Sequence, residues 1–362
     1  MASEDGRAVG FQPGIVFYQI ENLHGSRMFN EKFQHSKFIK FVHLFSHERM
    51  KVNLIDEPFV ARRPVVTIGI FDGVHKGHQF ILDNLKEQAG RNRGESAVVT
   101  LWPHPRIVLN KDVWDFRLLH SLEEKTRELE KRGVDRLIIV PFNREVASLS
   151  ACEFVVKYLV GKIGVEVLIM GYDNKFGRER KGDAGQLNDC ARTHGFRIVQ
   201  LPELAGNHEK VNSTTIRNAV LTGQLEQAKK LLGYHYYLTG TIVEGNRIGR
   251  KFGYPTANVH PLDPYKLIPL GGVYAVRIER EGATYSGMLN IGYRPTIDSA
   301  SEVKTIETHI FDVTGDFYGE QVVIHFIQRI RDEMKFSGID ELKNQLDKDR
   351  ITADRLLRDY NG

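Results

Sequence analysis

Five short apolar runs alternate with helical stretches in the first two thirds of the chain. The apolar runs lie at 65–71, 97–102, 136–142, 165–171 and 196–201. Helical spacing of apolar residues marks the segments between them, at about 78–92, 121–132, 150–162 and 183–194. Buried strands separated by helices predict an α/β domain with a doubly wound parallel sheet. Two more helices are expected at Thr214–Leu221 and Leu225–Leu232, and Gly233 is the expected C-cap of the second.

After Tyr234 the pattern changes to short runs rich in β-branched and aromatic residues, separated by turn residues. These runs lie at 236–243, 272–279, 284–291, 306–311 and 321–330. They predict an antiparallel β-barrel of about six strands, followed by a C-terminal helix over about 339–358. We therefore expect two domains, over 60–233 and 236–360, after a poorly ordered N-terminal extension over 1–50.

The segment Gly69–His78 joins the first predicted strand to the first predicted helix and reads Gly-Ile-Phe-Asp-Gly-Val-His-Lys-Gly-His. Its glycines let the backbone approach a ligand, and a helix N-terminus offers N–H groups and partial positive charge to a phosphate. His75 and His78 would share one face of the first helical turn. The segment resembles the HxGH signature of nucleotidyltransferases, which cleave a nucleoside triphosphate between its α- and β-phosphates. The flanking strand and helix favour this interpretation over a glycine-rich turn whose histidines only cap a helix.

Three further polar segments follow predicted strands, so they are expected to meet at the same edge of the sheet. They are Trp102–Arg106, Gly171–Gly177 and Asn212–Arg217. The guanidinium of Arg217 suits a phosphate, and Asp173 and Asn174 offer polar groups to a base, a ribose or a metal. Each segment also has a plainer interpretation, as a rigid Pro-His-Pro loop, a turn cap and a helix N-cap at Ser213.

The second domain begins with a glycine-rich string, Gly245–Asn258, whose glycines 245, 249 and 253 make a loop able to wrap phosphates. The Pro-Thr-Ala-Asn sequence that ends it predicts a short turn. That turn would present Thr256 and Asn258, whose oxygens are ligands that Mg²⁺ accepts together with nucleotide phosphates. The string is not a Walker A loop, because no Gly-Lys-Ser/Thr follows. A glycine-rich hairpin with a proline turn is the alternative.

These motifs, in this order, resemble the bacterial bifunctional riboflavin kinase/FMN adenylyltransferase (FAD synthetase) family. The first domain matches the family's GxFDGxHxGH, PHP, G-x-[DN]-F-x-F-G and [IV]SSTxIR elements, and the second matches GxxxGRxxGxPTAN. The resemblance continues at Gly272–Ala275, Asn290–Thr296, Ile306–Ile310 and Arg331–Phe336. Two residues depart from the family pattern: Asn174 stands in place of an aromatic residue, and Asn212 in place of serine.

The resemblance implies that the barrel phosphorylates riboflavin to FMN with ATP, and that the first domain adenylylates FMN to FAD and releases pyrophosphate. Glu307 would be the general base toward the riboflavin hydroxyl, and His75, His78 and Arg217 would complete the catalytic set. ATP or its phosphates would be bound by Gly69, Phe71, Asp72, Gly73, Gly77, Asp173, Ser213, Thr214, Gly245, Gly249, Arg250 and Gly253. The flavin would be bound by Pro103, His104, Pro105, Asn174, Asn290 and Arg294. The metal, Mg²⁺, would be bound by Thr256 and Asn258.

Three other functions stay open at this stage. Asn174 and Asn212 favour an enzyme in which only the kinase is competent. The first motif alone also fits another adenylyl- or cytidylyltransferase, although the second motif argues against it. A nucleotide- or flavin-binding regulator would require Glu307 and the two histidines to be incidental.

Composition narrows the class of protein further. Of 362 residues, 41% are hydrophobic and 27% charged, as in a soluble globular protein, and the net charge of +4 leaves no strong electrostatic footprint for nucleic acid. No apolar stretch approaches the roughly 20 residues of a membrane span. We expect small-molecule partners, no nucleic acid or membrane, and a monomer or transient homo-oligomer.

The two cysteines and the N-terminal segment bear on the cellular compartment in which the protein works. Cys152 and Cys190 have no CxxC partner, so we predict neither a disulfide framework nor a zinc site, and a reducing cytoplasm fits. The N-terminal segment lacks the pattern of a signal peptide. Phe38–Leu44 is a candidate strand within it, and Met28 and Met50 are alternative translation starts.

Overall fold

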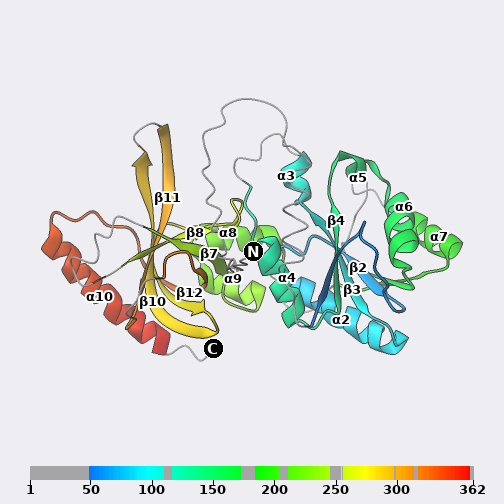
Figure 1. Ribbon diagram of the computed structural model, residues 1–362, viewed down its shortest axis with the longest axis horizontal. Helices are drawn as coiled ribbons and strands as arrows, with labels where there is room; N and C mark the ends of the chain where they lie inside the picture. Colours follow the sequence, from blue (N-terminus) through cyan, green and yellow to red (C-terminus); the bar gives the residue numbers. More distant parts are fainter. Residues whose placement is uncertain are drawn as a thin grey trace, which may run out of the picture.

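The chain forms a parallel-sheet domain and a barrel domain that lie side by side (Figure 1). The structure is a computed structural model, and it describes residues 49–109, 116–172, 184–203, 211–244, 254, 256–296, 299–313 and 317–358. In Figure 1 the sheet domain is on the right and the barrel on the left, with helices α8 (Ser213–Leu221) and α9 (Leu225–Leu232) between them. The candidate strand Phe38–Leu44 lies outside the described residues, as does nearly all of the expected extension.

The first domain is built on a six-stranded sheet whose pairings are all parallel, in the order β1-β4-β3-β2-β5-β6. Its strands are β1 Lys51–Leu54, β2 Val65–Ile68, β3 Ser96–Trp102, β4 Arg136–Pro141, β5 Val167–Met170 and β6 Arg197–Gln200. The predicted parallel sheet is thus confirmed. Strand β1 was not predicted, because it is half exposed and has no continuous apolar run.

Helices cover both faces of this sheet, as the doubly wound prediction requires. On β4, Leu137 faces a core with helices α2 and α4, whereas the next residue, Ile138, faces a core with α6 and α7. The helices are α2 Lys76–Asn92, α3 Pro105–Leu109, α4 Leu122–Lys131, α5 Arg144–Ser148, α6 Ala151–Phe154 with a π-helical continuation Val155–Ile163, and α7 Ala184–His194. Gly233 ends α9 at φ 86°, as the C-cap prediction expected.

The cysteine prediction was wrong in one respect. Cys152 and Cys190 form a disulfide between α6 and α7, with their Cα atoms 6.0 Å apart. The prediction considered only short cysteine spacings, and these cysteines lie 38 residues apart in sequence. Packing of the two helices on the same face of the sheet brings them together, which the spacing along the chain does not reveal.

The second domain is a closed barrel of six antiparallel strands, in the order β10-β11-β8-β7-β12-β9, which confirms the barrel prediction. Its strands are β7 Tyr237–Val243, β8 Ala257–Pro261, β9 Gly272–Arg280, β10 Ala283–Thr296, β11 Ser299–Ile310 and β12 Gln321–Arg331. Helix α10 (Ile339–Arg358) packs along the outside of the barrel (Figure 1). The predicted turn at Pro-Thr-Ala-Asn is corrected by β8, which begins at Ala257 and places Asn258 on a strand.

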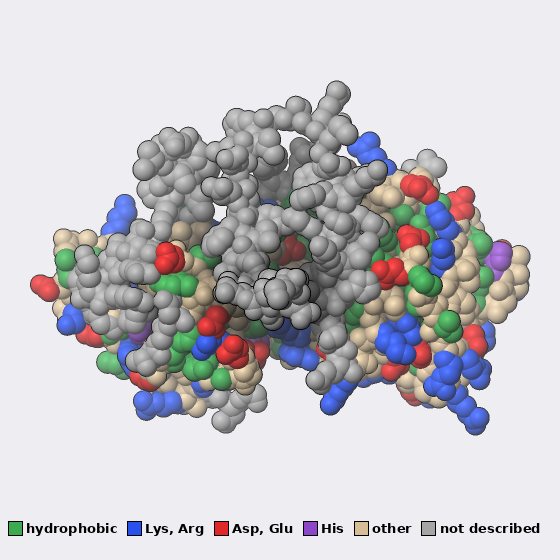
Figure 2. Space-filling model, viewed as in Figure 1, with side chains coloured by type: hydrophobic (Ala, Val, Ile, Leu, Met, Phe, Trp, Pro, Cys, Tyr) green, Lys and Arg blue, Asp and Glu red, His purple; other side chains and the backbone are tan. Residues whose placement is uncertain are grey.

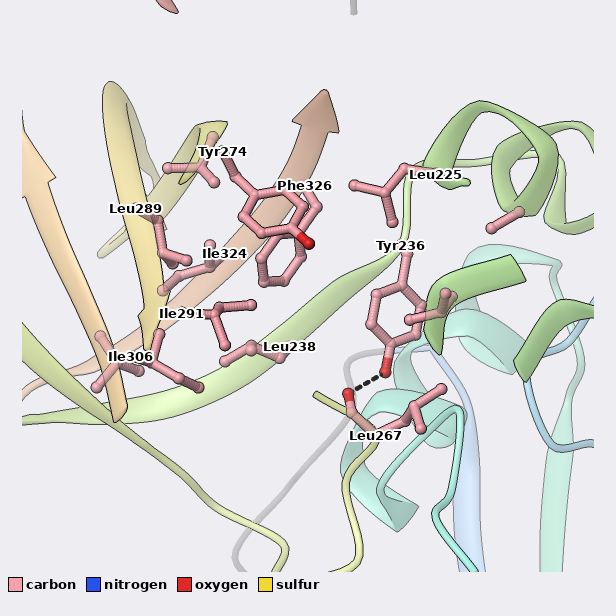
Figure 3. Close-up of a cluster of buried hydrophobic side chains, with 14 of the residues drawn as sticks. Leu225, Tyr236, Leu238, Leu267, Tyr274, Leu289, Ile291, Ile306, Ile324 and Phe326 are labelled. Carbon is pink, nitrogen blue, oxygen red and sulfur yellow. Dashed lines mark hydrogen bonds between the residues drawn. The ribbon is translucent and has the colours of Figure 1, made fainter. Parts of the chain in front are cut away.

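The two domains share one hydrophobic core. Side chains of α8 and α9, such as Leu225, pack with the barrel residues Leu238 and Phe326 in a single buried cluster (Figure 3). Tyr236, 1% exposed, lies at its centre and donates a hydrogen bond to the carbonyl of Leu267 at 2.6 Å. The two domains therefore form a continuous packed structure in this chain.

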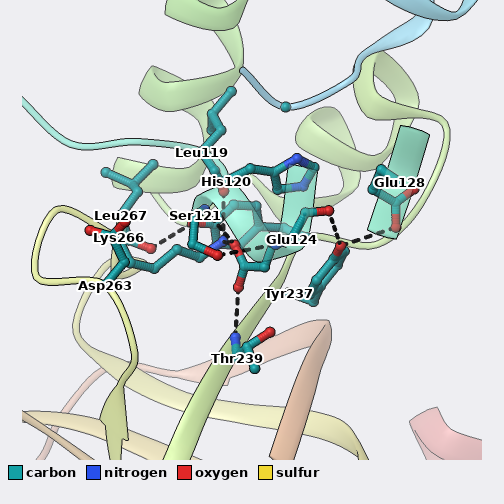
Figure 4. Close-up of polar contacts among 12 residues, drawn as sticks. Leu119, His120, Ser121, Glu124, Glu128, Tyr237, Thr239, Asp263, Lys266 and Leu267 are labelled. Carbon is teal, nitrogen blue, oxygen red and sulfur yellow. Dashed lines mark hydrogen bonds and ion pairs between the residues drawn. The ribbon is translucent and has the colours of Figure 1, made fainter. Parts of the chain in front are cut away.

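A buried ion pair also crosses between the domains. Glu124 of α4 lies 2.6 Å from Lys266 of the barrel domain, and each side chain is 1% exposed (Figure 4). Glu124 accepts hydrogen bonds from the backbone N–H groups of Ser121 and Thr239, and Lys266 donates to the carbonyl of Leu119. These bonds satisfy both charges where water is excluded.

Candidate functional site

The loop between β2 and α2 holds the first group of predicted site residues. His75 caps α2, and its Nδ1 accepts a hydrogen bond from the His78 backbone N–H at 3.4 Å. The two imidazole rings stack with centroids 3.6 Å apart. The loop turns at Phe71 (φ 52°) and Gly73 (φ 86°), where a Cβ would lie 2.7 Å from Leu119. The predicted strand, turn and helix are thus present, and both histidines lie at the helix N-terminus.

His78 is held in its neutral form. Burial lowers its pKa well below the ordinary value, and the nearby His75, Lys125 and His120 add to this effect. Its Nδ1 is buried and has no hydrogen-bond partner among the described residues. A neutral imidazole can recognise a phosphate by donating a hydrogen bond, without contributing charge.

Asp72 connects this loop to two other predicted elements. Its carboxylate pairs with Arg217 of α8 at 2.5 Å and accepts hydrogen bonds from the backbone N–H groups of Leu119 and His120. Its carbonyl accepts a hydrogen bond from the Ser213 hydroxyl at 2.9 Å. Arg217 is therefore oriented by Asp72, which also offsets part of the positive charge that a phosphate would meet.

The N-terminus of α8 keeps its cap although Asn212 replaces the family's serine. The Asn212 side chain accepts a hydrogen bond from the Thr215 backbone N–H at 2.9 Å, as serine would in this position. Thr214, in the first turn, is exposed to solvent. This departure from the family pattern thus leaves the local helix geometry intact.

The Pro-His-Pro segment follows β3 and packs toward the same region. Pro105 begins α3, and His104, between Pro103 and Pro105, accepts a hydrogen bond at Nδ1 from the Arg106 backbone N–H. Burial lowers the pKa of His104 to about 3. The Phe116 ring lies 4.7 Å from His104 and 4.8 Å from the Arg217 guanidinium. His104 of this loop and Arg217 of α8 therefore both pack against the Phe116 ring.

Several predicted site residues lie outside the described residues, so the structure adds nothing about them. They are Asp173, Asn174, Gly245, Gly249, Arg250 and Gly253. Arg294 belongs to β10, but its side chain also lies outside what the structure describes.

In the barrel, strand register places three predicted site residues side by side. Glu307 of β11 pairs with Asn258 of β8 on one side and with Asn290 of β10 on the other. The neighbours of Glu307 along the strand, Ile306 and Thr308, point away from this face, because side chains alternate along a strand. The carboxylate and the two amides therefore form a row across three strands, and all three are partly accessible.

Two residues pack close to this row. Gly292 follows Asn290 on the same face of β10, where a Cβ would lie 2.6 Å from the carboxylate of Glu333 and 3.1 Å from the Asn290 amide. Glycine at 292 thus leaves room for Glu333 against the row. His309, which shares the face of Glu307, packs between Tyr254 and Phe311, so its role is structural.

Sequence reasoning missed the residues that tie the first loop to the rest of the molecule. Tyr234 donates a hydrogen bond to the Gly73 carbonyl and lies 3.0 Å from His120. Lys125 is buried on α4 near His78 and His104. Neither residue belongs to a motif with a known spacing, and α4 is rich in charged residues, so the pattern gave no signal for them.

The fold and these two groups of side chains define a two-domain, nucleotide-dependent transferase. Residues 58–215 match the family described as FAD synthetase, and residues 232–357 match the family described as riboflavin kinase. The chain belongs to the family of bifunctional riboflavin kinase/FMN adenylyltransferases, since its curated relatives match over nearly their full length.

The relatives of this chain include proteins from distant bacteria. It is 37% identical to the bifunctional riboflavin kinase/FMN adenylyltransferase of Bacillus subtilis (strain 168), covering 82% of this chain and 93% of the relative. It is 38% identical to that of Escherichia coli (strain K12), covering 80% and 91%. A crystal structure from Streptococcus pneumoniae, named a macrolide-efflux protein, superposes with a TM-score of 0.76 at 31% identity, covering 86% of this chain and 99% of that one.

Two properties of the described part of the molecule complete the picture. None of its helices combines the length and apolar character that crossing a bilayer requires. On the face shown in Figure 2, Lys and Arg side chains lie interspersed with Asp and Glu over the sheet domain.

Proposed function

We propose that this chain phosphorylates riboflavin to FMN in the barrel and adenylylates FMN to FAD in the parallel-sheet domain. The observation that carries the proposal is the presence of both sets of motif residues on one chain, with the described members of each set on neighbouring segments of their own domain. Relatives that share most of its length are named for both activities.

In the barrel, Glu307 would take the proton of the primary hydroxyl of riboflavin while that oxygen attacks the γ-phosphate of ATP. A hydroxyl is a poor nucleophile, so a carboxylate within hydrogen-bond reach lowers the barrier. Asn258 and Asn290, which flank Glu307 in the strand register, would orient the phosphate and the flavin on either side of it.

In the sheet domain, the FMN phosphate would attack the α-phosphate of ATP in line, and pyrophosphate would leave. A phosphate is already anionic, so no general base is required, and catalysis depends on position and on neutralising charge. The N-termini of α2 and α8 and neutral His78 would donate hydrogen bonds, while Asp72 holds Arg217 in place.

The donors at the barrel site fit Mg²⁺. Thr256 and Asn258 supply a hydroxyl and an amide oxygen, which are hard oxygen ligands of the kind this ion prefers, and both side chains are partly accessible. Bound there with the nucleotide, the ion would neutralise phosphate charge. We further propose that the enzyme works on small molecules, as a monomer or transient homo-oligomer. We also propose that it works in the cytoplasm, where the Cys152–Cys190 disulfide would meet a reducing medium.

The experiment that tests this function is a time course of the purified chain with riboflavin, ATP and Mg²⁺, with flavins separated by chromatography. FMN that rises and then gives way to FAD is the expected result. FMN without FAD would restrict activity to the barrel, which is the alternative that Asn174 and Asn212 favour. Absence of both products would contradict the proposal.

Replacing His78 by alanine is expected to lower FMN adenylylation by about 10²–10³-fold, because one preorganised donor to the phosphates is lost. Riboflavin phosphorylation should be unchanged, since His78 lies in the other domain. The two steps are measured separately, with FMN or riboflavin as the flavin supplied. Loss of kinase activity in this variant would argue against separate sites.

Replacing Asn258 by alanine is expected to raise the Mg²⁺ concentration needed for half-maximal riboflavin phosphorylation. One hard oxygen ligand would be missing, so the ion would bind more weakly. The measurement is a Mg²⁺ titration of the kinase step at saturating ATP. An unchanged titration curve would remove Asn258 from the metal site.

A further inference from the structure

Lys125 of α4 carries a buried charge that neither reaction, as described above, makes use of. Its side chain is 1% exposed. The ammonium donates a hydrogen bond to Thr100 Oγ1 at 3.3 Å and lies 5.2 Å from the centre of the Trp102 ring. Within the part of the chain that the structure describes, it has no carboxylate partner.

Burying an ammonium group without an ion-pair partner costs desolvation free energy. Lys266, also buried, is paired with Glu124 at 2.6 Å, so its charge is compensated. Lys125 has only a hydroxyl and an aromatic face, and an apolar side chain of the same length would fill the space without a desolvation penalty. A buried cation with no ion-pair partner among the described residues therefore points to an anion that is present only when substrate is bound.

The surroundings of Lys125 show where that anion would be. Thr100, which accepts its hydrogen bond, donates in turn to the carbonyl of Ile70 in the Gly69–His78 loop at 3.3 Å. Trp102 directly precedes the Pro-His-Pro segment. The charge of Lys125 contributes to the low pKa values of both His78 and His104. Lys125 thus lies beneath the two loops expected to hold ATP and FMN.

We propose that Lys125 is a positioning residue of the adenylylation site, whose ammonium attracts the substrate phosphates and supports the Gly69–His78 loop that holds them. It supports the loop through its hydrogen bond to Thr100. It attracts the phosphates through the electric field of its positive charge, which is strong where water is excluded. The anion is a phosphate group, supplied by the triphosphate of ATP or by FMN. The inference rests on the proposed adenylylation of FMN and adds a residue to that site.

The proposal has a consequence for the pH dependence of the reaction. Burial lowers the pKa of Lys125 from 10.5 to about 8, opposed by Asp72 of the loop and Asp263 of the barrel domain. His78, His104 and His120 also face it, and burial lowers the pKa of each, so they stay neutral above pH 7. In the free enzyme the ammonium is therefore lost as the pH rises through about 8, and kcat/KM for adenylylation should fall there.

The test compares Lys125→Met, Lys125→Arg and the control Lys86→Met, which removes the same charge from α2, where Lys86 pairs with Asp83. Adenylylation is measured with ATP and FMN varied in turn, together with the binding of inorganic pyrophosphate. We expect Lys125→Met to lose about 10²-fold in kcat/KM, while Lys86→Met stays at the wild-type value. Lys125→Arg should restore most of the activity and abolish the fall above pH 8.

The two sources of phosphate are separated by the same data. A raised KM for ATP with weaker pyrophosphate binding assigns the charge to the triphosphate, and a raised KM for FMN alone assigns it to the flavin phosphate. Riboflavin phosphorylation, measured on the same preparations, should not change. Its retention shows that the variants are folded.

A purely structural role for Lys125 gives different results. It predicts a lower denaturation midpoint for Lys125→Met, whereas removal of an uncompensated buried charge leaves the midpoint unchanged or raises it. A lower midpoint together with an unchanged kcat/KM for adenylylation would overturn the proposal. So would a wild-type kcat/KM for adenylylation that does not fall above pH 8 relative to that of Lys125→Arg. Failure of the wild-type enzyme to make FAD would instead contradict the adenylylation function itself.

Discussion

Glu307→Gln is expected to lower riboflavin phosphorylation by about 10²–10⁴-fold and to leave FMN adenylylation unchanged. Glutamine has the shape of glutamate and fits beside Asn258 and Asn290, its neighbours in the strand register. It cannot accept the proton of the riboflavin hydroxyl. The loss should therefore fall on kcat, while the KM for riboflavin changes little.

The measurement uses riboflavin and FMN as alternative substrates for the same preparation, with flavins separated by chromatography. His309→Gln is the matched control, because His309 lies on the same face of β11 but packs between Tyr254 and Phe311. It should affect stability more than the chemical step. Equal loss of both reactions in Glu307→Gln would refute the assignment of one reaction to each domain.

Glu124→Ala is expected to destabilise the whole chain by about 3–5 kcal/mol, because it leaves Lys266 as an unpaired buried charge. It also removes the acceptor for two backbone N–H groups, at Ser121 and at Thr239. Burial already lowers the pKa of Lys266, and Glu124 is the main group that opposes this. The measurement is the free energy of unfolding from a denaturant titration.

Two control variants test whether the unpaired charge of Lys266 causes the loss of stability in Glu124→Ala. Glu124→Met combined with Lys266→Met removes both charges and should recover part of the loss, since no unpaired charge remains. Glu87→Ala removes an exposed ion pair with Arg91 on α2 and should change stability by no more than about 0.5 kcal/mol. A loss in Glu124→Ala as small as that in Glu87→Ala would show that the interdomain pair contributes little.

The fold was predictable where burial produces a continuous or alternating pattern. Strands such as β4 and helices such as α10 follow directly from their apolar residues. Strand β1 escaped prediction because it is half exposed, and β8 because its first residues read as a proline turn. Each of these strands is defined by its partners, β4 for β1 and β7 with β11 for β8, more than by its own composition.

The candidate site was predictable where a motif lies on one segment, as with His75 and His78. Contacts between segments that lie far apart in the sequence were not predictable. The pairing of Asp72 with Arg217, the disulfide of Cys152 with Cys190 and the position of Lys125 beneath two loops all depend on packing. A charged residue on a helix that is rich in charges carries no sign of burial until the neighbouring strands are in place.

The core that joins α8 and α9 to the barrel has a consequence for genetics. Tyr236 is not among the proposed site residues, yet it packs with side chains from both domains. A substitution there would lower both riboflavin phosphorylation and FMN adenylylation, each measured with its own flavin substrate. A screen that assigned residues to a reaction by the activity lost would place Tyr236 in both sites, although it is in neither set of proposed site residues.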